Sequence, residues 1–316
     1  MPDRILYLYP GQGSQSPGMG RELLDSFPEA GEIFDRADRV LGFSLSRICL
    51  EGPEEVLGLD LNAQLAVFTI SCITADILKA RGLRPDLLTG HSSGFYAAAY
   101  TAGCFGFEEG LLIVKRAGEI LAETAESMNG AMAVIFGLPL ETIERITRKV
   151  GGVEPALLNT PRQTIISGHS QAVRRAMEQA LEAGALDAHP LPFQAAYHSR
   201  LMERASRTFF AELSGQILRQ PQIPLLSYST LRPVRDEEDL KETLALQLSS
   251  PVRWADLIRR FKDQGSTVFV EMGPGTVLSR TLRWIDRDIR VENTSTREDM
   301  LRTIRHLRKK PDGRNP

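Results

Sequence analysis

The chain has 316 residues, of which 42% are hydrophobic and 25% charged, a composition typical of a globular protein with a sizeable core. Its formal net charge of −2 gives no electrostatic argument for nucleic-acid binding, and we find no apolar run near the roughly 18 residues of a membrane-spanning helix. The N-terminus lacks a signal-peptide pattern, and the three cysteines suit a reducing compartment rather than a disulfide framework. We therefore expect a cytoplasmic protein with no bound metal or cofactor and no nucleic-acid or membrane partner.

The first part of the chain alternates strand and helix patterns. Residues 4–9 form an apolar run typical of a buried strand, and residues 10–15 follow as a glycine-rich loop. Helical patterns continue to about residue 82, residues 86–89 predict a second strand, and helices then run to about residue 128. This alternation predicts a parallel sheet covered by helices.

A different pattern begins near Asn129. It predicts strands over 131–137, 153–159, 163–167 and 188–193, and helices over 140–150 and 170–183, which is the order of a ferredoxin-like unit. Two later strands are predicted over 224–228 and 267–271. We therefore predict an α/β fold with an α/β-hydrolase-like parallel-sheet core (1–128 and 195–307), an inserted ferredoxin-like subdomain (129–194) and a disordered tail (308–316). The cleft between core and insert is the expected ligand site.

The pentapeptide Gly90-His91-Ser92-Ser93-Gly94 lies between the predicted strand 86–89 and a helix-forming run. A Gly-x-Ser-x-Gly pattern between a strand and a helix is typical of a nucleophile elbow, which exposes a reactive serine on a sharp turn. The same pattern also fits a glycine-rich turn without chemistry. On the catalytic interpretation, Ser92 is the nucleophile.

A serine nucleophile needs an adjacent base and donors for the oxyanion. Among the five histidines we favour His198, because it follows the insert where the chain crosses the expected cleft. His91 is expected to be a packing residue, since neighbouring side chains on an elbow point apart. The main-chain N–H of Ser93 is one expected oxyanion donor, and the loop containing Gln12 is suited to supply the other.

These segments together resemble the malonyl-CoA:acyl-carrier-protein transacylase family, which includes the acyltransferase domains of polyketide synthases. The resemblance covers nearly the whole chain. It is carried by six ordered segments: Pro10–Gln15, Gly90–Gly94, Gly130–Ala133, Tyr197–Met202, Gln247-Leu248 with Pro251–Trp254, and Glu271–Gly275.

The resemblance implies that Ser92 takes an acyl group from a thioester, with His198 as base and the N–H groups of Gln12 and Ser93 as oxyanion donors. A main-chain carbonyl at Gln247 is implied to orient the histidine. The donor is implied to be an acyl-CoA or acyl-phosphopantetheine, and the acceptor the thiol of an acyl carrier protein in fatty-acid or polyketide biosynthesis.

One departure concerns the acyl group. Malonyl-specific members carry an arginine before the glycine that corresponds to Gly118, whereas this chain has Ala117 there and Arg116 one position earlier. Helical periodicity places Ala117 on the apolar face and Arg116 about 100° away from it, on a side that suits pairing with Glu119. We favour a solvated Arg116 over a carboxylate anchor, and therefore a non-malonyl acyl group.

Two further departures indicate a remodelled acyl pocket. Ser93 replaces an aliphatic residue of the family pattern, and Phe95 replaces a glutamate. Tyr197 is bulky where many members have serine, which in polyketide acyltransferases accompanies acyl groups without an α-branch.

Other functions stay open at this point. A trans-acting acyl hydrolase would share the fold and pass the acyl group to water, and an ordinary malonyl transacylase would use Arg116. A non-catalytic carrier-binding subunit is disfavoured because the nucleophile, base and oxyanion segments are all present. An acidic carrier protein would need a basic rim, which either of two groups supplies: Arg259, Arg260 and Lys262, or Arg280, Arg283 and Arg287.

Overall fold

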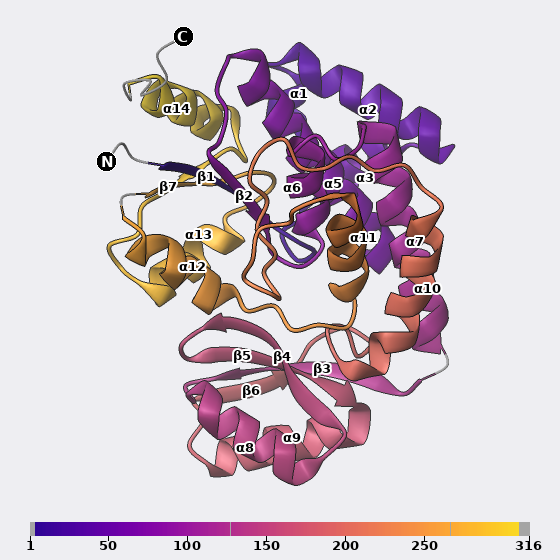
Figure 1. The fold of residues 1–316 in the computed structure, drawn as a ribbon, viewed down its shortest axis with the longest axis vertical. Coiled ribbons are helices and arrows are strands. Elements are labelled where there is room, and N and C mark those ends of the chain that lie inside the picture. Colours follow the sequence, from indigo (N-terminus) through magenta and orange to yellow (C-terminus); the bar gives the residue numbers. More distant parts are fainter. Residues whose placement is uncertain (1–3, 127, 266, 310–316) are drawn as a thin grey trace.

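The computed structural model describes residues 4–126, 128–265 and 267–309, and it contains two separate sheets (Figure 1). The first is wholly parallel, with strand order β2-β1-β7-β8. The second is antiparallel, with strand order β4-β5-β3-β6. The predicted fold class, a parallel-sheet α/β core with a ferredoxin-like antiparallel unit, is therefore confirmed.

The parallel sheet forms where short apolar runs pair at the centre of the core. Its strands are β1 (Arg4–Tyr9), β2 (Leu87–Gly90), β7 (Thr267–Glu271) and β8 (Val291–Asn293). Helices surround it: α1 (Arg21–Leu24), α2 (Pro28–Leu41), α3 (Leu45–Glu51), α4 (Glu54–Leu57), α5 (Asp60–Ala80), α6 (Gly94–Thr101), α7 (Phe107–Glu126), α10 (Glu203–Ser214), α11 (Glu237–Leu246), α12 (Trp254–Asp263), α13 (Val277–Ile285) and α14 (Arg297–Arg308). A 3₁₀ turn, η1 (Arg200–Met202), precedes α10.

The antiparallel sheet carries its own small core. It contains β3 (Gly130–Phe136), β4 (Val153–Thr160), β5 (Gln163–His169) and β6 (Asp187–Pro190), with α8 (Leu140–Val150) and α9 (Ser170–Glu182) on its outer face. Toward the larger body, β4 contacts α12 and α13, and the Leu158 N–H donates to the Val252 carbonyl at 2.8 Å. The antiparallel unit thus meets the larger body along β4.

Helix α5 is long and apolar enough to cross a membrane by length and composition, although we expected no such segment from the sequence. In the fold, 83% of its most apolar stretch is buried. It is the central helix of the larger core, where it packs between α2, α6 and α7.

Two of the predicted strands differ from the structure, and the predicted domain boundaries are not tested by it. Residues 224–228 do not form a strand; they run beside β2 and exchange two hydrogen bonds with Leu88, from Leu88 N–H to Pro224 and from Leu226 N–H to Leu88. Strand β6 ends at Pro190, earlier than predicted. The domain boundaries stay a prediction, and of the tail expected over 308–316, residues 310–316 lie outside the described residues.

Candidate active site

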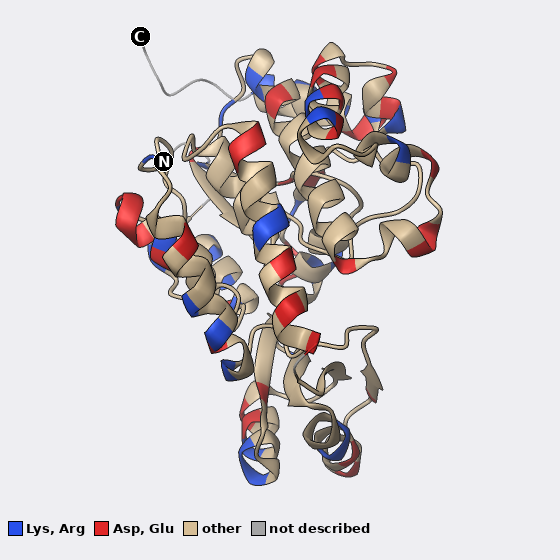
Figure 2. Cartoon of the chain, turned by 90° about the vertical axis from the view of Figure 1, so that its right-hand side faces the viewer, with Lys and Arg blue, Asp and Glu red and all other residues tan. Residues whose placement is uncertain are grey.

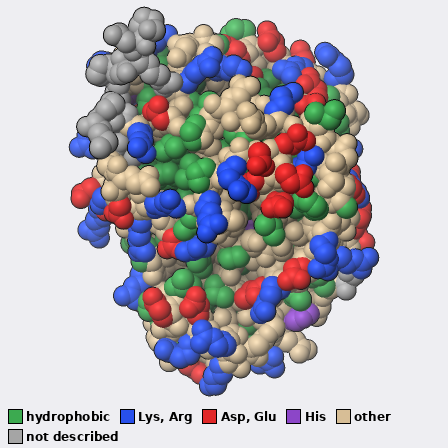
Figure 3. Space-filling view, in the orientation of Figure 1, with side chains coloured by type: hydrophobic (Ala, Val, Ile, Leu, Met, Phe, Trp, Pro, Cys, Tyr) green, Lys and Arg blue, Asp and Glu red, His purple; other side chains and the backbone are tan. Residues whose placement is uncertain are grey.

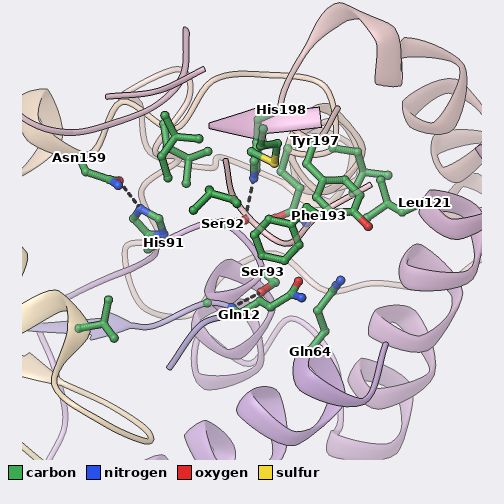
Figure 4. Close-up of a pocket in the computed structure, with 18 of the residues that line it drawn as sticks. Gln12, Gln64, His91, Ser92, Ser93, Leu121, Asn159, Phe193, Tyr197 and His198 are labelled. Atoms are coloured by element: carbon green, nitrogen blue, oxygen red, sulfur yellow. Dashed lines mark hydrogen bonds between the residues drawn. The ribbon is translucent and has the colours of Figure 1, made fainter. Parts of the chain in front are cut away.

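Ser92 and His198 come together at the end of the parallel sheet. Ser92 lies on the turn between β2 and α6 with a left-handed backbone, φ 52°. Its Oγ lies 2.7 Å from Nε2 of His198, and the imidazole points at the serine across the pocket (Figure 4). The two residues that the sequence selected as nucleophile and base therefore form a hydrogen-bonded pair.

The two glycines of the pentapeptide are required by close backbone packing. A Cβ on Gly90 would lie 2.2 Å from the carbonyl carbon of Gly94, and a Cβ on Gly94 would lie 2.2 Å from the carbonyl oxygen of Tyr9. Neither position has space for a side chain. The turn is consequently clamped against β1, which fixes the direction of the serine side chain.

His198 is held by main-chain groups of one later segment. Its own N–H donates to the Leu248 carbonyl at 3.1 Å, and its ring Nδ1 lies 3.1 Å from the Ser250 carbonyl oxygen. A carbonyl accepts only from an N–H, so this contact places the proton on Nδ1 and leaves the Nε2 lone pair facing Ser92. Burial lowers the pKa of His198 to about 4, so the ring is a neutral acceptor at neutral pH.

The residue that orients the His198 ring is Ser250, and not Gln247 as expected. The carbonyl that accepts the hydrogen bond from the ring is that of Ser250, and the Gln247 main chain acts more weakly on the same imidazole. The side chain of Gln247 instead lines the pocket. The sequence identified the right segment and the right kind of group, but the turn after α11 places a residue three positions later against the ring.

The loop containing Gln12 lies directly against the elbow. The main-chain N–H of Gln12 donates to Oγ of Ser93 at 3.2 Å, and the side-chain Nε2 of Gln12 donates to Asp60 at 2.7 Å. The Tyr197 hydroxyl donates to the other oxygen of the same carboxyl group at 2.6 Å. Ser93 opens the first turn of α6, where main-chain N–H groups lack helical partners. Both expected oxyanion donors thus lie beside Ser92, and Asp60 ties the Gln12 loop to Tyr197.

His91 is a packing and linking residue, as expected. Its Nε2 lies 2.9 Å from Oδ1 of Asn159 on β4, and its ring contacts Trp254 edge-on with 5.1 Å between centroids. Burial lowers the pKa of His91, so the ring stays neutral and its Nε2–H donates to the amide oxygen. This bond connects the elbow to the antiparallel sheet.

Between the two sheets lies a cavity of about 210 Å³ that opens onto Ser92. Its wall is mostly apolar and includes side chains from both units, and none of its lining residues is Lys, Arg, Asp or Glu. The lining residues are Gly11, Gln12, Gln64, His91, Ser92, Ser93, Tyr96, Leu121, Met132, Leu157, Asn159, Ile165, Leu191, Phe193, Tyr197, His198, Gln247, Leu248, Val277 and Leu278.

Of the four residues predicted to form the acyl pocket, Tyr197 lines this cavity, and three do not. Ala117 is fully buried in the core, and Phe95 packs edge-on against Tyr228 at 6.0 Å between ring centroids. Leu121, one turn after Ala117 on the same face of α7, reaches the cavity instead. The apolar face of α7 was predicted correctly, but only part of that face borders the cavity.

Arg116 points to the other side of α7. Its Nε and Nη2 each lie 2.8 Å from a carboxyl oxygen of Glu212 on α10, and its Nη1 contacts Glu119 and Glu123 at 3.3 and 3.1 Å. Figure 2 views the molecule from this side, where acidic and basic positions follow one another along the helices. The Glu212 carboxylate raises the pKa of Arg116, so the guanidinium is fully engaged outside the cavity.

Gln64 and Phe193 are among the lining residues that the sequence analysis did not single out. Gln64 projects from α5 into the cavity (Figure 4), and Phe193 enters it from the segment after β6. Gln64 is a polar residue within an otherwise apolar, buried helical stretch, which was a usable signal. Within the described ranges, His, Cys, Asp and Glu side chains form no group of three or more that could hold a metal ion.

Comparison with known proteins agrees with this geometry. The model of the "Acyl transferase domain" family matches residues 6–298. A malonyl CoA-acyl carrier protein transacylase of Bacillus subtilis is 36% identical over 313 residues, covering 98% of this chain and 99% of that protein.

Two solved structures extend the comparison to the fold. The malonyl CoA-acyl carrier protein transacylase of Coxiella burnetii superposes with a TM-score of 0.94 at 33% identity, covering 97% of this chain and 98% of the other. A malonyl-transacylase solved in complex with a type II PKS acyl-carrier protein gives 0.93 at 30% identity, covering 96% and 100%.

Proposed function

Since the chain belongs to the acyl transferase family and is an acyltransferase, we propose that it moves an uncharged acyl group through Ser92 to the phosphopantetheine thiol of an acyl carrier protein. The donor is an acyl-CoA or acyl-carrier thioester, and the setting is the cytoplasmic synthesis of fatty acids or polyketides. The names of the compared proteins support the carrier protein as partner. The choice of an uncharged acyl group rests on the cavity beside Ser92, because its lining residues include no Lys or Arg.

The first half-reaction acylates the serine. As Ser92 Oγ attacks the thioester carbonyl carbon, its proton passes to Nε2 of His198, 2.7 Å away. The carbonyl oxygen takes the negative charge and accepts from the main-chain N–H groups of Gln12 and Ser93. That oxygen replaces the Ser93 hydroxyl as the acceptor for Gln12. The carbon–sulfur bond then breaks, and the leaving thiolate takes the proton from the imidazolium.

The second half-reaction reverses the same steps with a new thiol. The carrier thiol gives its proton to His198 as its sulfur attacks the acyl carbon, and the bond to Ser92 Oγ breaks with return of the proton to the serine. The Nδ1–H···O bond to Ser250 keeps the imidazole in one tautomer through both steps. No residue has to change place between the half-reactions.

A malonyl group would bring a carboxylate into this cavity. Burying an unpaired carboxylate costs several kcal/mol, and Arg116 is held outside by Glu212. The Asp60 carboxyl accepts hydrogen bonds from the lining residues Gln12 and Tyr197, and an ionised carboxylate there carries the same sign as malonate. A neutral chain meets no such penalty, and the Gln64 amide offers it a hydrogen bond.

The test compares two thioesters of equal size: malonyl-CoA and its analogue with a carboxamide in place of the carboxylate. The mass of the intact chain after mixing reports acylation, with Ser92→Ala as the blank. We expect the neutral analogue to acylate Ser92 at least roughly tenfold faster. Faster acylation by malonyl-CoA would overturn the choice of acyl group. Discharge of the loaded serine by holo-carrier protein, but not by water, separates a transferase from a hydrolase.

A paired substitution checks that the cavity sets the preference. Gln64→Arg places a cation in the cavity, and Gln64→Met is a matched control of similar size without charge. We expect the ratio of malonyl to neutral acylation to rise with the arginine and to stay level with the methionine. An equal ratio in both variants would count against the cavity as the acyl site.

A further inference from the structure

Helix α13 extends from the mouth of the cavity to the open surface. Its first residue, Val277, lines the cavity and is 44% exposed, and Trp284, two turns later on the same side, is 76% exposed. The other tryptophan of the chain, Trp254, is fully buried. A large aromatic side chain left in solvent beside a cavity mouth marks a surface that a partner covers.

Three arginines flank this tryptophan. Arg280, Arg283 and Arg287 are all exposed, and none forms an ion pair with the described part of the chain. In the space-filling view, basic and apolar side chains lie together in the region that α12 and α13 occupy in Figure 1 (Figure 3). The surface therefore presents three arginines, none of them in an ion pair within the described residues, around an apolar centre.

In the neighbouring basic group on α12, two of the three side chains already have partners. Arg260 donates to the Leu231 carbonyl, and Lys262 pairs with Asp286. Within the described residues this leaves Arg259 as the one member of that group without a partner. Of the two basic groups that the sequence offered, the one on and just after α13 is therefore available for binding.

The start of α13 is rigidly fixed. The fully buried carboxyl of Glu271 accepts from the N–H groups of Leu278 and Ser279 at 2.8 Å each, and from the Ser279 hydroxyl at 2.5 Å. These bonds satisfy the free N–H groups of the first turn and join the helix to β7, the central strand next to β1. The exposed side of α13 is thus held at a constant position relative to Ser92.

We propose that this side of α13 is the docking surface for the acidic carrier protein, an inference that rests on the proposed function. The carrier must bring its thiol to Ser92 through the cavity mouth, and α13 forms part of that mouth. The tryptophan supplies an apolar anchor, and the arginines attract an acidic partner and orient it. The docking surface consists of Val277, Arg280, Arg283 and Trp284 on α13 and of Arg287, two residues after the helix ends.

The test measures how fast acylated Ser92 is discharged by holo-carrier protein and, separately, by free pantetheine. Trp284→Ala should slow discharge to the carrier roughly 30-fold, and Arg280→Glu or Arg283→Glu roughly three- to tenfold each. Discharge to pantetheine should stay within about twofold, because the small thiol needs no docking surface. Arg148→Glu, at an exposed position on α8, is the matched control and should match the wild type.

The emission of Trp284 gives a second, activity-independent measurement. Titration with unacylated holo-carrier should shift its emission to the blue and protect it from acrylamide, and added salt should weaken both effects. Carrier discharge at the wild-type rate in the α13 variants, or a titration without any change, would overturn the docking surface. Failure of any thioester to acylate Ser92 would instead overturn the proposed function, while the titration would still decide the docking surface.

Discussion

Arg116→Ala separates the two interpretations of the cation on α7. In the structure, the guanidinium makes a two-bond contact with Glu212 at 2.8 Å and further contacts with Glu119 and Glu123. Arg116 and Glu212 side chains are each 36% exposed. The substitution should therefore weaken the joint between α7 and α10 and leave the acyl preference unchanged.

The size of both effects follows from this geometry. Partly exposed ion pairs contribute about 0.2–1 kcal/mol each, so loss of the whole group should lower the free energy of unfolding by about 1–2 kcal/mol. An arginine that anchored a buried malonyl carboxylate would behave differently. Its truncation would cost about 2–5 kcal/mol in the acylation transition state, which is at least roughly 30-fold in kcat/KM for malonyl-CoA alone.

Two measurements on the same preparation distinguish these outcomes. Urea unfolding reports stability, and kcat/KM for malonyl-CoA and for its carboxamide analogue reports preference. Arg47→Ala is the control, because Arg47 makes one exposed pair with Glu51 on α3 and should change neither. A fall of tenfold or more in the malonyl to neutral ratio on Arg116→Ala would refute the assignment of Arg116 to the helix joint.

Two further predictions concern the pH dependence of acylation and the buried carboxyl group of Glu271. Because burial lowers the pKa of His198 to about 4, the base stays neutral above that pH; Ser92 acylation, followed by stopped-flow thiol release, should stay level from about pH 8 to pH 5 and fall toward pH 4. An inflection near the ordinary histidine pKa of about 6.5 would contradict the burial argument. Glu271→Gln should lower the free energy of unfolding by roughly 2 kcal/mol, because an amide nitrogen would face the N–H donors of α13. An unchanged urea midpoint would contradict the role given to these carboxyl–main-chain hydrogen bonds in stability.

The sequence predicted the elements of the antiparallel unit closely, and the reason is local. Its strands are short apolar runs bounded by Gly, Pro or Asn, and its helix over Leu140–Val150 has a strong period of 3.6. Residues 224–228 have the same apolar character. Among the residues of β2, however, only Leu88 exchanges main-chain hydrogen bonds with them. Whether an extended run pairs along its length depends on the partner strand, which composition does not reveal.

The acyl pocket shows a different limit of sequence reasoning. Periodicity on α7 correctly separated buried Ala117 from partly exposed Arg116. It could not separate side chains that face a cavity from those that face the core, because both are apolar and both are shielded from solvent. That distinction depends on the position of the inserted unit, because Met132 and Phe193 of the predicted insert line the cavity together with Leu121. Only the assembled fold shows which turn of the helix borders empty space.

The Ser92–His198 pair depends on a strained backbone at both residues, and the sequence signals this strain only for Ser92. Ser92 and His198 have φ values of 52° and 59°, and Leu231 is the only other non-glycine residue with positive φ among those the structure describes. Each such conformation costs on the order of 1–2 kcal/mol, so contacts from elsewhere must hold it. For Ser92 the contacts come from the adjacent glycines packed on β1, which is why its motif is readable in the sequence. For His198 they come from the Leu248 and Ser250 carbonyls, about 50 residues later in the chain. The segment after α11 therefore holds the proposed base, His198, through main-chain carbonyls, and its side-chain types do not reveal that role.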